Sequence, residues 1–145
     1  MKRYVLNKVH KFIKYLSRRK KKVFSNIYSL NEINHRFGNR NQQYDYFHHY
    51  YWNLGPSWLR EHRNYFTQEL RGYGEDAFHS MWYFIFNEFK PKKVLQIGVY
   101  RGQTISLFSL LSKKAGYLAE IHALSPFLSV GDSVSEYIKE IDYKK

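Results

Sequence analysis

The residues best suited to chemistry lie in the stretch 94–104, VLQIGVYRGQT, where a short apolar run is followed by two glycines. Residues 93–97 have the composition of a buried parallel strand. Gly98 and Gly102 fall where the backbone must turn tightly and approach a ligand without a Cβ in the way. The pattern is typical of a site for a nucleotide-like cofactor in an α/β sheet.

The elements that would position this turn follow it along the chain. Residues 105–114 carry apolar side chains at helical spacing, and Gly116 suits a left-handed helix end. Residues 120–124 form a second apolar run, which closes a strand–helix–strand unit. The sequence therefore predicts an α/β fold in which these two strands are parallel.

The turn resembles the first motif of class I S-adenosylmethionine-dependent methyltransferases, which is an acidic residue followed by three alternating glycines. Gln96 stands at the acidic position, Gly98 and Gly102 at the outer glycines, and Tyr100 at the middle one.

Longer stretches extend this likeness. Residues 90–102 and 120–127 resemble a bacterial branch of the superfamily that is associated with sugar and polysaccharide modification. The resemblance runs from residue 72 to residue 143.

The resemblance implies a methyltransferase that holds S-adenosylmethionine in the glycine turn and acts on a small molecule or a glycan. An acidic residue at the end of the second strand usually binds the ribose hydroxyls of this cofactor, but here Ser125 follows the strand. The resemblance assigns no catalytic residue. It assigns cofactor binding to Gln96, Gly98, Tyr100, Arg101, Gly102, Gln103, Thr104 and Ser125.

The same turn has a rival interpretation as a dinucleotide-binding site. Its fingerprint, Gly-x-Gly-x-x-Gly, would need glycines at Tyr100 and Gln103 and an acidic residue about 20 residues further on. Glu120 has this spacing, but it begins the second strand, on the order of 15 Å from the ligand end. A tight turn that binds no ligand is the third interpretation.

Too few strands are present for a complete doubly wound sheet. Two convincing strands follow Pro91, whereas such sheets usually have at least about four. We therefore expect the first half of a Rossmann-like methyltransferase sheet, in an N-terminal fragment that ends after the second strand and a helix over 131–141. Such a fragment should expose its strand faces, associate with itself and bind its cofactor weakly.

Three regions are predicted along the chain. They are a basic amphipathic arm (1–22), a helical, aromatic-rich region (23–90) and the partial cofactor-binding domain (91–145). The middle region contains a turn at 38–41 and helices over 57–70 and 75–89.

The aromatic residues at 44–52 are expected to form part of the hydrophobic core, because large aromatic side chains dominate protein cores. The alternative interpretation is a surface on which a sugar or a partner stacks. Two small groups contain residue types that bind metals, but each lacks the second ligand pair that a metal site needs. They are Asp45 with His48 and His49, and Asp76 with Glu75 and His79.

The net charge of +12 is concentrated in the arm. Residues 1–22 contain ten Lys or Arg and no acidic residue, which leaves 14 basic and 12 acidic residues in the rest of the chain. Apolar residues recur at helical spacing in the arm, so it would lie on an anionic membrane surface, bind a phosphate-rich polymer or pack on the body of the protein. No motif for sequence-specific nucleic-acid binding is present.

The composition of the chain also indicates in which cellular compartment the protein is expected. The chain has no cysteine, which excludes disulfides and thiolate metal sites. No apolar run approaches the roughly 18 residues of a membrane span, and the N-terminus lacks the pattern of a signal peptide. We expect a cytoplasmic protein, peripheral at the inner membrane surface if the arm binds there. A non-catalytic membrane-surface or protein-interaction role is the alternative function.

Overall fold

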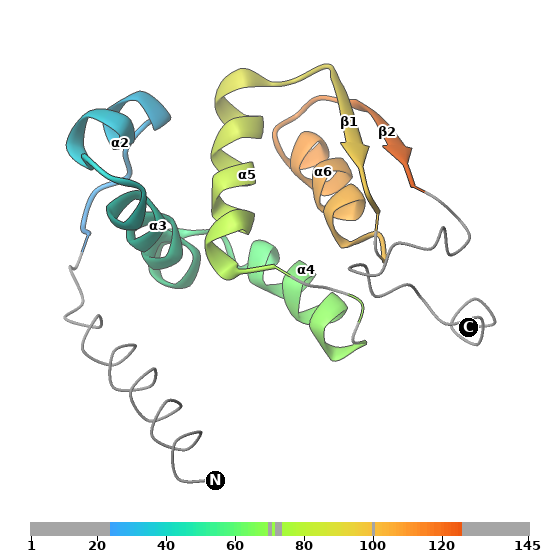
Figure 1. Ribbon diagram of the computed structural model, residues 1–145, viewed down its shortest axis with the longest axis horizontal. Helices are drawn as coiled ribbons and strands as arrows, with labels where there is room; N and C mark the ends of the chain where they lie inside the picture. Colours follow the sequence, from blue (N-terminus) through green and yellow to red (C-terminus); the bar gives the residue numbers. More distant parts are fainter. Residues whose placement is uncertain (1–23, 70, 72–73, 100, 126–145) are drawn as a thin grey trace, which may run out of the picture.

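The computed structural model describes residues 24–69, 71, 74–99 and 101–125, and this part of the chain forms a mixed α/β structure (Figure 1). Helix α5 runs between α2 and α3 on one side and α6 with the two strands on the other. The predicted arm and the helix over 131–141 lie outside the described residues. The elements are α2 (Leu30–Arg36), α3 (Arg40–His49), the π-helical turn η1 (Tyr50–Leu54), α4 (Ser57–Gln68), α5 (Asp76–Phe89), β1 (Lys93–Ile97), α6 (Gln103–Lys114) and β2 (Glu120–Leu124).

Two α-helices precede Ser57, in a stretch that the sequence predicts as part of a helical region without placing individual helices, and both begin at strong local caps. Helix α2 begins at a capping box, in which the Ser29 side chain accepts from the Glu32 backbone and the Glu32 carboxylate accepts from the Ser29 N–H. The Asn39 side chain caps α3 through the backbone N–H of Gln42. The predicted turn at 38–41 is therefore shorter, because Arg40 already belongs to α3.

Helix α5 contributes to two hydrophobic clusters, one on each side. Ala77 and Phe84 pack with residues of α2, α3 and η1, and Phe86 packs with residues of η1, α4 and α6. The ring of Phe86 stacks on that of Phe108 with centroids 5.2 Å apart. The prediction that the aromatic stretch forms core is confirmed for four of its members. These are Tyr46, Phe47, Tyr50 and Tyr51, which are all buried.

The strands β1 and β2 pair in parallel from Lys93↔Glu120 to Ile97↔Leu124, as the sequence predicts. Val94 and Ile121 pack against the cluster around α6. The other face is open, with Leu95 60%, Ile97 75% and Leu124 61% exposed. The apolar run at 93–97 therefore forms a strand that is covered on one face only, and the predicted exposure of the strand faces is confirmed.

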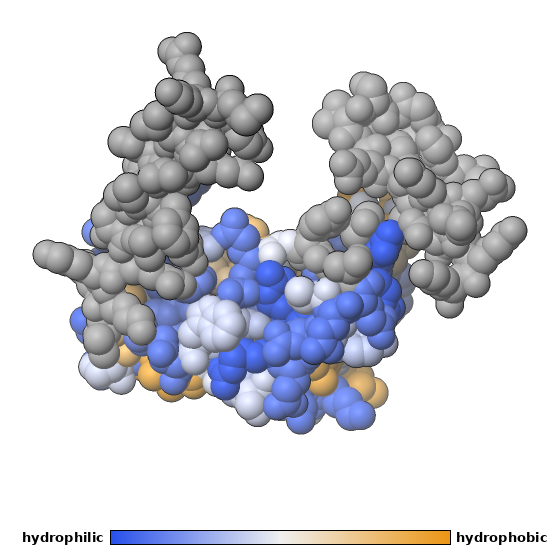
Figure 2. All heavy atoms as spheres, turned by 90° about the horizontal axis from the view of Figure 1, so that it is seen from below, coloured by the Kyte–Doolittle hydropathy of each residue, from blue (hydrophilic) through white to orange (hydrophobic). Residues whose placement is uncertain are grey.

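The surface is mixed in character. The face seen in Figure 2 is mostly hydrophilic, with small separate apolar patches along one edge. Among the described residues, none of the helices combines the length and the apolar character that a membrane span requires.

Candidate functional site

A small hollow lies at the carboxyl end of β1, where the chain turns into α6. Its volume is about 120 Å³, and six of the eight predicted cofactor-binding residues line it. Ser125 lies beside the turn, where its hydroxyl donates to the Val99 carbonyl over 3.2 Å. Tyr100 lies outside the described residues. The lining consists of Arg71, Gln96, Gly98, Arg101, Gly102, Gln103 and Thr104.

Both glycines of the turn have left-handed backbone conformations. Gly98 has φ 80° and Gly102 has φ 81°, a region that other residues rarely adopt. A Cβ at either position would meet nothing within 4 Å, so the backbone conformation, and not a lack of space, requires glycine there. The Gly98 N–H donates to the Leu124 carbonyl over 2.8 Å, which ties the turn to β2. The open space above the glycines gives a ligand access to the backbone.

We expect Gly102→Ala to lower the free energy of unfolding by about 1 to 2 kcal/mol, because it forces a Cβ into a left-handed conformation at the start of α6. Urea unfolding measures this loss. Gly38→Ala is the matched control, since Gly38 has open space around it and no positive φ. Equal stability of the two variants would contradict the assignment of strain to the turn.

Gln96 lines the hollow with a half-satisfied amide. Its Nε2 donates to the Gly98 carbonyl over 3.0 Å. Its Oε1 is buried without a hydrogen-bond partner among the described residues, which costs about 1 to 3 kcal/mol. A hydroxyl or ammonium group of a ligand would remove this cost by donating to Oε1.

The hollow has positive character. Arg71 and Arg101 line it, and the backbone N–H groups at the start of α6 carry the positive end of the helix dipole. The Arg71 guanidinium also pairs with Glu69 at 2.5 Å and lies over the Phe66 ring, 4.8 Å from its centroid. The arrangement can bind a carboxylate or another anionic group. Sequence reasoning missed Arg71, because nothing in the stretch after α4 distinguishes it from a surface arginine.

A second, larger hollow of about 410 Å³ lies between α5 and α6 and adjoins the first at Gln103 and Thr104. Sequence reasoning missed this hollow too, because four of its residues follow the spacing i, i+3, i+4, i+7 of an ordinary core face. Those four are Phe78, Met81, Trp82 and Ile85, and the rest of the lining is Gly74, Glu75, His79, Gln103, Thr104 and Leu107.

A histidine pair lies beside the second hollow, with His79 buried and His62 half-buried. The His79 Nε2 is 3.5 Å from the Gln103 Nε2, and the His62 Nε2 is 3.1 Å from the Ser106 hydroxyl. The two imidazole centroids are 6.0 Å apart. Burial lowers the pKa of His79 to about 4 and lowers the pKa of His62 as well, so both rings are neutral at pH 7.

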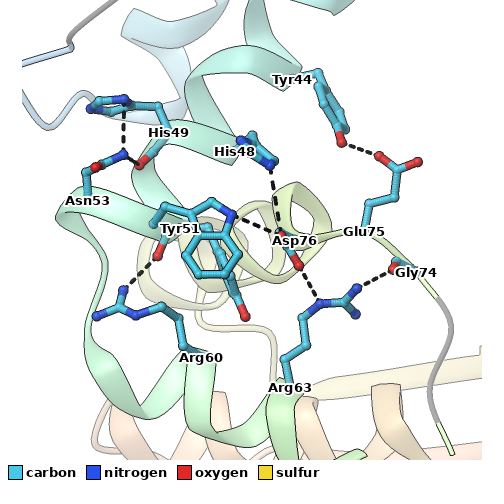
Figure 3. A network of polar contacts seen from close by, with 11 residues as sticks. Tyr44, His48, His49, Tyr51, Asn53, Arg60, Arg63, Gly74, Glu75 and Asp76 are labelled. Atoms are coloured by element: carbon cyan, nitrogen blue, oxygen red, sulfur yellow. Dashed lines mark hydrogen bonds and ion pairs between the residues drawn. The ribbon is translucent and has the colours of Figure 1, made fainter. Parts of the chain in front are cut away.

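A polar network fixes the rim of the second hollow (Figure 3). The Asp76 carboxylate accepts from Arg63 Nε at 2.5 Å and from Trp52 Nε1 at 3.0 Å. Arg63 also donates from Nη2 to the Gly74 carbonyl over 2.6 Å, and the Tyr44 hydroxyl donates to the Glu75 carboxylate. These bonds hold the start of α5 against α4, α3 and η1. Within the described residues no group of three metal-ligating side chains occurs.

The fold and the site together define a mixed α/β protein in which a parallel strand–helix–strand unit carries a glycine turn beside two adjoining hollows. A search of protein-family models, curated proteins and solved structures finds no match to the chain.

Proposed function

We propose that this protein binds S-adenosylmethionine at the turn between β1 and α6 and takes part in methyl transfer to a small molecule or a glycan. On this proposal β1, α6 and β2 belong to a Rossmann-like methyltransferase sheet. The observation that carries it is the gathering of six predicted cofactor residues around one hollow at the carboxyl end of β1. Ligands of open α/β sheets bind at this end of the strands.

The residues around the hollow fit the cofactor in part. Bound S-adenosylmethionine supplies an electrophilic methyl group. Gly98 and Gly102 leave the backbone open to it, Arg101 and the start of α6 offer donors to its carboxylate, and Gln96 Oε1 offers an acceptor. Ser125 would stand where the family usually has an acid. The first hollow is smaller than the roughly 300 Å³ of typical ligand pockets, so we expect weak binding.

Calorimetric titration tests this proposal. We expect S-adenosylmethionine to bind the wild-type chain with a dissociation constant weaker than about 1 μM, and Gln96→Glu to bind it more strongly, because a carboxylate is the stronger hydrogen-bond acceptor. Gln68→Glu adds the same charge at an exposed position of α4 and should leave the affinity unchanged.

Three results would contradict this account. The absence of saturable heat with both the wild type and Gln96→Glu removes the cofactor assignment. Tighter binding of a nicotinamide dinucleotide than of S-adenosylmethionine favours the dinucleotide interpretation of the turn. Sub-micromolar affinity of the wild type contradicts the expected weak binding.

A second proposal concerns residues 1–22, whose ten basic residues and apolar spacing favour an anionic membrane surface as partner. The protein would then be cytoplasmic and peripheral at the inner membrane surface. We expect the chain to co-sediment with vesicles containing phosphatidylglycerol at low salt and to be released by salt. Serine at residues 18–22 should reduce the bound fraction at least about tenfold, since each basic residue contributes about 1 kcal/mol. Equal sedimentation of both proteins would remove the membrane proposal.

A further inference from the structure

The second hollow is suited to a different kind of molecule from the first. Its volume of about 410 Å³ falls within the roughly 300 to 1,000 Å³ of small-molecule sites, which are mostly apolar with a few placed polar groups. Phe78, Met81 and Trp82 supply an aromatic and thioether wall from α5, and Leu107 faces them from α6. A sugar ring would leave most of its hydroxyls without partners against such a wall, whereas a flat apolar ring would not.

Apart from the Glu75 carboxylate at the rim, which accepts from the Tyr44 hydroxyl, the polar groups of this hollow are few and come from both helices. His79 and Gln103 lie 3.5 Å apart through their Nε2 atoms, both side chains are buried, and Thr104 follows Gln103 on α6. Gln103 and Thr104 also line the first hollow. A ligand whose hydrogen-bonding group met these residues would therefore point that group toward the glycine turn.

We propose that the second hollow binds a flat, apolar ring system that carries a hydroxyl group, with the ring against Phe78 and Trp82 and the hydroxyl toward His79 and Gln103. If the proposed methyl transfer holds, this molecule is the acceptor, and that identification rests on the proposed function. The binding itself does not require the cofactor.

Phe78 provides a sharp test because it is 47% exposed, so its removal leaves little unfilled core. The Phe89 side chain lies at the other end of the same helix, is 70% exposed and does not line the hollow, which makes Phe89→Ala the matched control. Met81 lines the hollow, so its ¹³C-labelled methyl group reports on occupancy by nuclear magnetic resonance.

The experiment titrates 2-naphthol into the full chain without cofactor and follows the Met81 methyl signal. We expect a saturable shift, a dissociation constant raised about tenfold by Phe78→Ala, and a change of less than about twofold with Phe89→Ala. Methyl glucoside as the probe should give no saturable shift.

The outcomes separate this inference from the proposed function. No saturable shift with 2-naphthol, an equal effect of the two variants, or tighter binding of the glucoside overturns the inference whatever the cofactor titration shows. If 2-naphthol binds through Phe78 and S-adenosylmethionine does not bind, the ligand class of the hollow stands and the methyl-transfer proposal fails.

Discussion

We expect Asp76→Ala to lower the free energy of unfolding by about 2 to 3 kcal/mol, because it removes one partner of a part-buried ion pair and the charge-assisted hydrogen bonds that this carboxylate accepts. Asp76 joins three elements, because it accepts from Arg63 on α4 and from Trp52 in η1 while itself beginning α5. Removal of the Asp76 carboxylate leaves the Arg63 guanidinium without this partner, and the Nη1 atom of that guanidinium is already buried without a hydrogen-bond partner. Urea unfolding at pH 7 measures the loss.

The matched control is Glu69→Ala, which removes an ion pair of the same 2.5 Å length at a more exposed position. Exposed pairs contribute roughly 0 to 1 kcal/mol, so this variant should lose little stability. A double-mutant cycle with Arg63→Met isolates the coupling between Arg63 and Asp76. A loss no greater in Asp76→Ala than in Glu69→Ala would show that the network does not hold the start of α5 in place.

The elements after residue 74 were predictable because their signals are local. The apolar spacing of α5 and the proline after it determine that helix, and short apolar runs bounded by turn residues determine β1 and β2. Helices α2 and α3 begin at local caps but lack such periodicity, and distant contacts hold them in place. The backbone N–H of Leu30 donates to Glu88 over 2.7 Å, and that of Tyr28 donates to the Tyr46 hydroxyl over 3.0 Å. No pattern within the segment itself encodes these contacts.

The candidate site likewise has one part that the sequence could predict and one part that it could not. The glycine turn was predictable because Gly98 and Gly102 are needed for a backbone conformation, which sequence spacing expresses directly. The role of Arg71 and the second hollow were not predictable, because each depends on how helices from separate parts of the chain meet. The residues Phe78 and Trp82 have the spacing of core residues, and only the position of α6 leaves space beside them.

The largest pH effect is expected from His79. Burial, together with the nearby charge of Arg63 and the neighbouring His62, lowers its pKa to about 4, while a hydrogen bond to the Glu75 backbone and the Asp76 carboxylate oppose this shift. An unfolded histidine titrates at about 6.5. Between these two values the unfolded chain binds a proton that the folded chain does not. Stability therefore falls as the pH is lowered through this window, and the effect of His79 is complete below pH 4.

The difference between the two pKa values corresponds to about 3 kcal/mol of stability lost from His79 between pH 7 and pH 4. Urea unfolding across this range should show a steep loss in the wild type and a smaller one in His79→Gln, which keeps a polar side chain but does not titrate. His62 adds a loss of the same sign in both proteins, because burial lowers its pKa too. A parallel pH dependence of the two proteins, or a His79 ring signal that titrates near pH 6.5, would show that this imidazole is not held neutral beside the second hollow.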